Sequence, residues 1–394
     1  MRMVVTVVAL VVLVEASSRL YFLALGLSPR QYFHRASVFP SNENAQGFDD
    51  LMIEVSPHSR REIHPYFGFI ANRQRASVNS AGFHSQFTYP YHRQPGDYVI
   101  GVFGGSVAEN FVTGGGVSDL TEALRKSMPA LKEKNLIVLN MAGGASKQPQ
   151  SYLIASFYAG MFDMTINLDG FNEVTFDANW RNYPSYYPQF SSFFFPADSL
   201  KNLNLHLAIV LNSWRFTIVS WAQGNSSIFS SGGLTMVAAA AVGAVNRITF
   251  YLYDEWSTHP EYLPTLSKEQ FANEAVENWR NFTHKQAKLM AAWNTKSFFF
   301  IQPNLHNPNS KPLSELEKAK ASLGYATRLD VGAQYEKLEE ARAQLAREKL
   351  KVFNLSEIFK DVTETVYIDS CCHLNELGNR YLARAMARAI VSEQ

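Results

Sequence analysis

The sequence predicts an α/β fold built around a parallel β-sheet. From residue 97 onwards, short apolar runs are bounded by polar residues or glycine, as expected for buried strands. Stretches with helical character separate several of these runs, and strands that alternate with helices are typical of a parallel sheet. Polar residues follow several of the runs directly, and chemical groups at successive strand ends indicate an active site.

Five apolar runs are the predicted strands: Tyr98–Phe103, Leu136–Leu139, Met164–Leu168, Ser297–Ile301 and Lys351–Leu355. The predicted helices are Ser118–Lys126, Gln148–Gly160, Gln334–Lys351 and Asn375–Val391. The third of these helices is strongly charged, which predicts a solvated face without chemistry of its own. The last is amphipathic and ends the fold.

The chain divides into three parts. Residues 1–27 form an apolar N-terminal segment, and residues 28–96 contain many turn formers, which predicts an irregular lead-in. Residues 97–394 form the α/β domain, in which the span of about 179–295 breaks the alternation and predicts a mostly helical insertion. Two apolar stretches of this insertion, Leu205–Trp221 and Leu234–Val245, are predicted to be packing helices rather than membrane spans.

The N-terminus carries the strongest targeting signal. Arg2 precedes the apolar run Met3–Val14, and apolar character resumes at Leu20–Leu27 after the interruption Glu15–Arg19. A spanning helix needs about 20 residues, so we expect a membrane anchor that holds the rest of the chain outside the cytoplasm, in the periplasm or at the cell surface. A signal peptide cleaved after Ala16 is the alternative and predicts secretion. A buried soluble helix is the third interpretation.

Composition excludes some functions. Among the 394 residues, Lys and Arg number 36 and Asp and Glu 35, so the chain lacks the basic surplus that binds nucleic acid. The hydrophobic share of 46% is enough for one large domain or two smaller ones. Cys371 and Cys372 are adjacent, so they build neither a disulfide framework nor a metal site, and two buried thiols are favoured over a vicinal disulfide.

Ser106 is the candidate nucleophile. It follows a predicted strand and the pair Gly104-Gly105, which permits a tight turn into a helix. A serine hydroxyl needs a neighbouring base to become nucleophilic, and its backbone N–H and the helix N-terminus favour an oxyanion nearby. The plain alternative is a turn with a helix cap. The Gly-x-Ser-x-Gly elbow is absent, because Ala108 occupies the position of the second glycine.

His373 is the candidate base, and Asp369 is placed to hold its imidazole in the correct tautomer. This acidic neighbour and the position before the last helix distinguish His373 from the other histidines. Asn172 offers a side-chain amide that can stabilise an oxyanion, although asparagine is also a common helix cap. The backbone N–H of Gly144 or Ala145 is a further predicted donor.

These residues lie in four blocks, which are Phe103-Gly-Gly-Ser106, Asn140-Met-Ala-Gly-Gly-Ala145, Asp169-Gly-Phe-Asn172-Glu and Asp369-Ser-Cys-Cys-His373. Their order resembles the SGNH (GDSL-type) serine hydrolase superfamily over roughly residues 97–178 and 297–391. The resemblance implies a flavodoxin-like three-layer α/β/α fold. It implies Ser106 as nucleophile and His373 as base, oriented by Asp369. An oxyanion hole would combine the Ser106 N–H, an N–H of Gly144 or Ala145, and the Asn172 side chain.

Two departures from the family pattern affect particular roles. The family's last block is Asp-x-x-His, whereas one residue more separates Asp369 from His373. In the second block, Ala145 stands where the family normally has its oxyanion glycine, with Gly144 one step earlier. Alanine keeps its backbone N–H, so the donor role is retained.

The resemblance implies an extracytoplasmic serine esterase that needs no metal or organic cofactor. Bacterial relatives outside the cytoplasm often act on acetylated polysaccharides, so an O-acyl or O-acetyl ester of a carbohydrate is the expected substrate. The aromatic stretch Trp180–Phe195 could stack on sugar rings, although core or lipid packing would use the same residues. The alternatives are acyl transfer to a sugar hydroxyl of an envelope or exopolysaccharide, and a non-catalytic envelope protein that binds a glycan or a partner protein.

Overall fold

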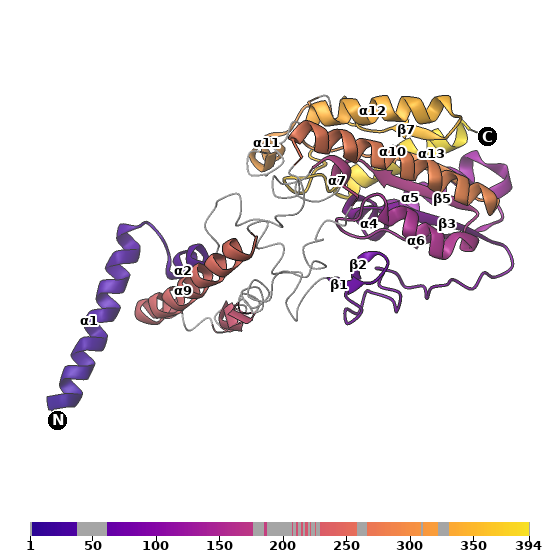
Figure 1. Ribbon diagram of the computed structural model, residues 1–394. Coiled ribbons are helices and arrows are strands. Elements are labelled where there is room, and N and C mark those ends of the chain that lie inside the picture. Colours follow the sequence, from indigo (N-terminus) through magenta and orange to yellow (C-terminus); the bar gives the residue numbers. More distant parts are fainter. Residues whose placement is uncertain are drawn as a thin grey trace. The chain divides into compact units, whose positions relative to one another are not determined.

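The computed structural model describes residues 2–37, 61–175, 185–186, 229–257, 266–308, 310–321 and 331–393, together with a few positions between 207 and 225. Contacts divide the chain into two units, which we call the helical unit (residues 1–60 and 192–262) and the sheet unit (residues 61–191 and 263–394). Figure 1 labels most of the elements of both units. Each unit is described by itself.

The sheet unit contains the predicted parallel sheet. Its strands are β3 (Asp97–Gly104), β4 (Asn135–Asn140), β5 (Met164–Asp169), β6 (Lys296–Ile301) and β7 (Val352–Asn354). All neighbours pair in parallel, in the order β4-β3-β5-β6-β7. All five strands agree with the apolar runs, which confirms the predicted α/β class. The chain continues from β3 to β4 at the edge of the sheet and then crosses back over β3 to β5. Sheets with this connectivity bind ligands at the point where the strand order reverses direction.

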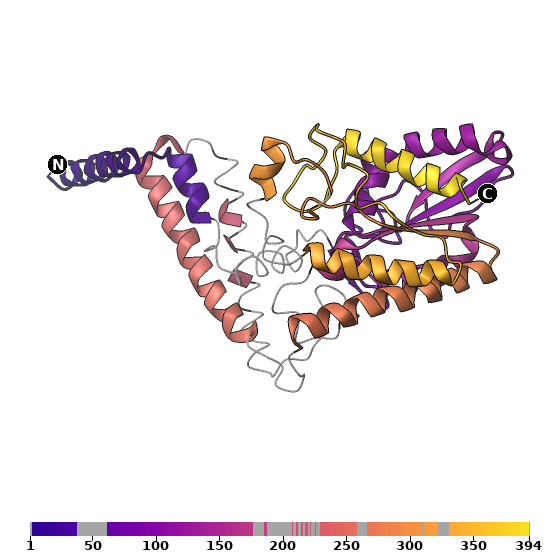
Figure 2. The same ribbon diagram turned by 90° about the horizontal axis from the view of Figure 1, so that it is seen from above.

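Helices cover both faces of this sheet and make three layers. Figure 2 shows α5 (Gly116–Ser127) and the yellow helix α13 (Glu376–Val391) on one face, with α10 (Lys268–Ala292) and the orange helix α12 (Val331–Arg347) on the other. α6 (Gln150–Tyr158) also packs against α10. Successive residues of each strand point to opposite faces. In β3, Ile100 therefore packs in the core on the side of α5 and α13, and Val99 packs on the side of α6.

The remaining elements of the sheet unit are short. They are α4 (Ser106–Thr113), α7 (Phe171–Val174), α11 (Glu315–Ala321), the 3₁₀ turns η1 (Pro129–Leu131) and η2 (Ala159–Met161), and the antiparallel hairpin β1 (Arg61–His64) and β2 (Gly68–Ala71). The hairpin comes from the predicted lead-in, yet its residues Phe67 and Ile70 are buried in the same core cluster as Val99 of β3. Part of the lead-in therefore belongs to the sheet unit.

The predicted insertion of about 179–295 is divided between the two units. α10 covers the sheet, because Val276 and Trp279 on its apolar face pack in one buried cluster with Phe299 of β6. The amphipathic pattern of α10 is that of a helix that packs on a sheet. The helical insertion is therefore shorter than predicted. The stretch Leu234–Val245 lies inside α9 (Gly232–Ser257), whereas most of Leu205–Trp221 lies outside the described residues.

The helical unit is formed by α1 (Arg2–Ala24), α2 (Pro29–Ser37) and α9. Phe33 of α2 packs on Ala239 and Val242 of α9. Glu15 of α1 accepts hydrogen bonds from the N–H groups of Gly232 and Gly233, at 2.8 and 2.9 Å, and so caps the N-terminus of α9.

The predicted N-terminal membrane anchor is wrong. Across the described residues, the structure contains no helix with both the length and the apolar character needed to cross a bilayer. The polar interruption in α1 explains the difference, because Glu15 caps α9 and pairs with Arg19 at 2.7 Å. The membrane-anchored location outside the cytoplasm, predicted from the same segment, is therefore not supported.

Candidate active site

Ser106 begins α4 immediately after β3. Gly104 has a φ of 131°, and a Cβ there would lie 2.1 Å from the carbonyl oxygen of Leu168 on β5. Only glycine fits at this point, which lets the two strand ends lie close together. Gly105 is the N-cap of α4, and Ser106 is partly exposed at the helix N-terminus. The free N–H groups of a helix N-terminus favour negative charge at this position.

Asn172 lies beside the turn that carries Ser106. It follows β5, in the short helix α7, and its Nδ2 donates to the carbonyl oxygen of Ser146 at 2.9 Å. A Cβ at Gly105 would lie only 2.0 Å from this Nδ2. The amide therefore covers Gly105 and is adjacent to Ser106, as a side-chain oxyanion donor must be.

The second block forms a loop after β4 that contacts the same turn. The N–H of Gly143 donates to the carbonyl of Gly104 at 3.2 Å. Ala145 has a φ of 63°, in the left-handed region that alanine rarely adopts. The Gly144 N–H interacts with the carboxylate of Glu109, so one of the two predicted backbone donors already faces an acidic side chain.

Asp369 and His373 are in direct contact. Oδ2 of Asp369 bonds Nδ1 of His373. Oδ1 accepts the N–H groups of Cys371, Cys372 and His373 at 3.0, 3.1 and 3.3 Å. The chain thus turns around the carboxylate, and this turn accommodates the extra residue between the pair. Burial disfavours the charged carboxylate, but the bonds from His373 and the backbone outweigh it and lower the pKa of Asp369.

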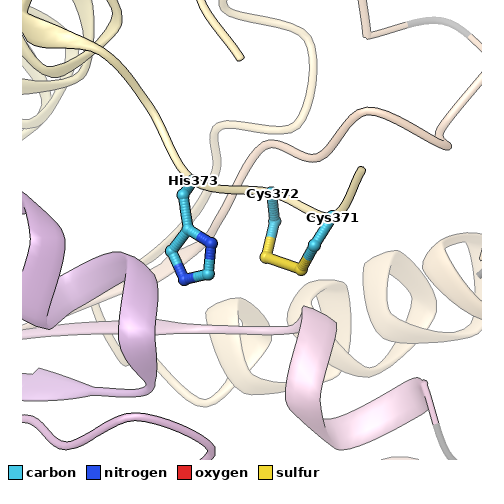
Figure 3. A group of neighbouring side chains, drawn as sticks. All are labelled: Cys371, Cys372 and His373. Atoms are coloured by element: carbon cyan, nitrogen blue, oxygen red, sulfur yellow. A yellow bond between two sulfur atoms is a disulfide. The ribbon is translucent and has the colours of Figure 1, made fainter. Parts of the chain in front are cut away.

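Cys371 and Cys372 form a disulfide, so the prediction of two thiols is wrong. Figure 3 shows the reason: the turn directs both sulfurs and the His373 ring to the same side of the backbone. Cysteine binds metals as a thiolate. The ligand atoms of Cys371, Cys372 and His373 lie within 4.8 Å of one another, yet the sulfurs are already bonded to each other in this state.

The three predicted catalytic segments border one buried cluster. Val107, Phe171 and Cys372 are the sequence neighbours of Ser106, Asn172 and His373, and all three are buried in one cluster. Within the described residues, no hydrogen bond joins the Ser106 hydroxyl to the His373 ring. Catalytic hydrogen bonds are often long without substrate and tighten when it binds.

Sequence reasoning missed a polar cluster beside Ser106. Glu109 lies one helical turn after Ser106, and its carboxylate is 3.5 Å from Nε2 of His84. Burial raises the pKa of Glu109, while His84, Arg61 and the Gly144 N–H act in the opposite direction. The i,i+3 spacing from Ser106 was a usable signal for Glu109. His84 and Arg61 come from the lead-in, where no pattern marks them.

A second missed group lies behind Asn172. Glu173 and Lys147 are almost fully buried. Glu173 is the third residue of α7 and accepts the N–H of Gly170, its N-cap residue, at 2.6 Å. A glutamate at this position after a strand end is a known helix-start pattern, so the sequence contained a signal for it. Burial lowers the pKa of Lys147 to about 7.

Comparison with family models gives no match, and comparison with curated proteins gives no match either. The aromatic stretch Trp180–Phe195 lies outside the described residues except for Ser185 and Tyr186. The assignment of function therefore depends on the geometry at the strand ends.

Proposed function

We propose that the protein is a serine ester hydrolase of the SGNH type. The observations that support this proposal are that the segments of Ser106, Asn172 and His373 border one buried cluster, that the Asn172 amide lies against Gly105, and that Asp369 bonds His373. Numbered within the sheet, the strand order is 2-1-3-4-5, which is the flavodoxin-like order that the resemblance implies.

In the proposed reaction, Ser106 Oγ attacks the ester carbonyl and its proton passes to Nε2 of His373. Asp369 accepts from Nδ1, which fixes the tautomer and stabilises the imidazolium that forms. The Ser106 N–H, an N–H of the second block and the Asn172 amide stabilise the tetrahedral oxyanion. His373 then returns its proton to the leaving alkoxide, and water repeats the sequence to release the acid.

The proposed substrate is an ester of a small acyl group, and the acetylated carbohydrate that the resemblance implies is the first candidate. The partly exposed hydroxyl at a helix N-terminus, with donors on two sides, supports a small acyl group. A panel of acetylated glycans, compared with short and long fatty-acyl esters, tests this choice. Acetate release from the glycans is the expected result, and turnover of long acyl esters alone would contradict it.

The catalytic proposal is tested by hydrolysis of p-nitrophenyl acetate. Ser106→Ala is expected to lower kcat by about 10³-fold or more, because the nucleophile is lost. Ser118→Ala is the matched control, since the hydroxyl of this exposed serine on α5 donates to the carbonyl of Gly115, at 3.0 Å, away from the candidate site. Wild-type turnover by Ser106→Ala would exclude the proposed nucleophile.

A further inference from the structure

Glu173 joins the two segments that carry the oxyanion donors. Its Oε2 accepts the N–H of Gly170 at 2.6 Å, which holds the turn before Asn172. Its Oε1 accepts the N–H of Gln148 at 3.2 Å, in the loop of the second block. The two carboxylate oxygens thus hold both segments at once.

A second link between these segments passes through Asn172 itself. Its Nδ2 donates to the carbonyl of Ser146, two residues before Gln148. Because an amide nitrogen carries two hydrogens, this bond leaves the other for an oxyanion. Displacement of the Gln148 segment would move Ser146 and turn the amide away from Gly105, which its Nδ2 now covers.

Lys147 is the basic partner of Glu173. It is fully buried, interacts with Glu173 and Glu274, and bonds the carbonyl of Ser185. Ser185 in turn donates its N–H and hydroxyl to Glu274 at 2.9 and 3.0 Å. A buried charge persists only with such partners. This network holds Lys147 beside Glu173.

We propose that Glu173, supported by Lys147, is a positioning residue that sets the geometry of the oxyanion hole. This inference rests on the proposed esterase function. Glu173 contacts no reacting atom. It acts by holding the Asn172 amide and the second-block loop at the spacing that the tetrahedral oxyanion requires, and small displacements of such groups cost about 10²-fold in rate.

Glu173→Gln tests the inference in the full-length chain. Glutamine keeps one acceptor oxygen and directs an NH₂ group at the second N–H, so one of the two links is lost. With p-nitrophenyl acetate we expect kcat to fall about 10²-fold while KM changes less than about 3-fold. In an Asn172→Ala background the same substitution should lower kcat clearly less than it does in wild type, because one of the two donors that Glu173 positions is already gone.

Two further variants separate positioning from folding. Glu277→Gln alters an exposed carboxylate on the same helix as Glu274 that pairs with Arg280, at 2.6 Å, outside the Lys147 network, so its kcat should stay within about 3-fold of wild type. Glu173→Asp keeps the charge next to Lys147 but is too short to reach both N–H groups. It should fold and lose at least about 10-fold in kcat, which provides the test if Glu173→Gln does not fold.

Equal losses of kcat from Glu173→Gln in the wild-type and Asn172→Ala backgrounds would show a merely structural role and overturn the inference. Wild-type kcat in Glu173→Asp would also overturn it. If Ser106→Ala retains activity, the esterase proposal itself fails. If Ser106→Ala is inactive and both Glu173 variants are unaffected, only the positioning role fails.

Discussion

Gly105 leaves the space in which the Asn172 amide lies. A Cβ at this position would be 2.0 Å from Nδ2 of Asn172 and 3.0 Å from the carbonyl oxygen of Ser146. The φ of Gly105 is −86°, which alanine adopts without strain. Gly105→Ala should therefore displace the Asn172 amide while the φ of residue 105 stays unstrained. We expect kcat for p-nitrophenyl acetate to fall about 10²-fold, as for loss of one oxyanion donor.

Gly143→Ala is the control for this prediction. A Cβ at Gly143 meets only the Ser146 hydroxyl, at 3.2 Å, which can rotate away. Its kcat should stay within about 3-fold of wild type. Equal activity of the two variants would show that the amide of Asn172 takes no part in catalysis.

The residues that sequence reasoning identified share a position next to a strand end or a helix start. Ser106, Asn172 and His373 could be found in this way because such ends meet at one edge of a parallel sheet. Glu109 and Glu173 were missed because their roles depend on contacts with the second-block loop. The disulfide was missed for a similar reason, since sequence spacing does not show how the chain turns around Asp369.

At the scale of elements, α11 secures the segment that leads to the Asp369–His373 pair. Glu317 of α11 bonds Lys311 at 2.5 Å, and both side chains are completely buried. The same carboxylate accepts the N–H groups of Val366 and Tyr367, at 2.8 and 3.0 Å. Because these two residues shortly precede Asp369, we infer that Glu317 stabilises the path of the last block.

Glu317→Gln should lower the free energy of unfolding by about 3 kcal/mol, because it leaves Lys311 buried without its partner. Urea denaturation measures the loss. Glu315→Gln is the control on the same helix, because the Glu315–Lys318 pair is exposed, and it should cost less than about 1 kcal/mol. Similar losses from both variants would contradict the role given to Glu317.

This contribution should also depend on pH. Burial raises the pKa of Glu317, but Lys311 and the backbone N–H groups outweigh it and lower the value to about 2, from 4.5. A carboxyl group whose pKa is lower in the folded chain than in the unfolded chain stabilises the fold above pH 4.5. This stabilisation is lost as the pH falls towards 2. The difference in the free energy of unfolding between wild type and Glu317→Gln should be constant near neutral pH. It should shrink as the pH falls from 4.5 to 2.

The elements were largely predictable, and their grouping was not. Continuous apolar runs such as Phe298–Ile301 are typical of strands buried on both faces, so all five strands could be located. α10 was assigned to the insertion because its helical periodicity shows which side is apolar without showing what that side covers. Its contact with Phe299 places it in the sheet unit.

At the scale of the whole molecule, long-range contacts overturn the reading of the N-terminus. The apolar runs on either side of Glu15 predicted a membrane anchor, whereas Glu15 caps α9 from more than 200 positions away in the sequence. A partner at that separation leaves no local pattern. The two units likewise interleave along the chain, so composition alone did not divide them correctly.

Fluorophosphonate labelling of the purified full-length chain tests the central claim most directly. We expect one adduct per chain, mapped by mass spectrometry to Ser106, because in the proposed mechanism His373 activates this hydroxyl and the oxyanion donors stabilise the adduct. Labelling should disappear in Ser106→Ala and become at least about 10²-fold slower in His373→Ala. An adduct on another residue, no adduct, or an unchanged rate in His373→Ala would contradict the proposed active site.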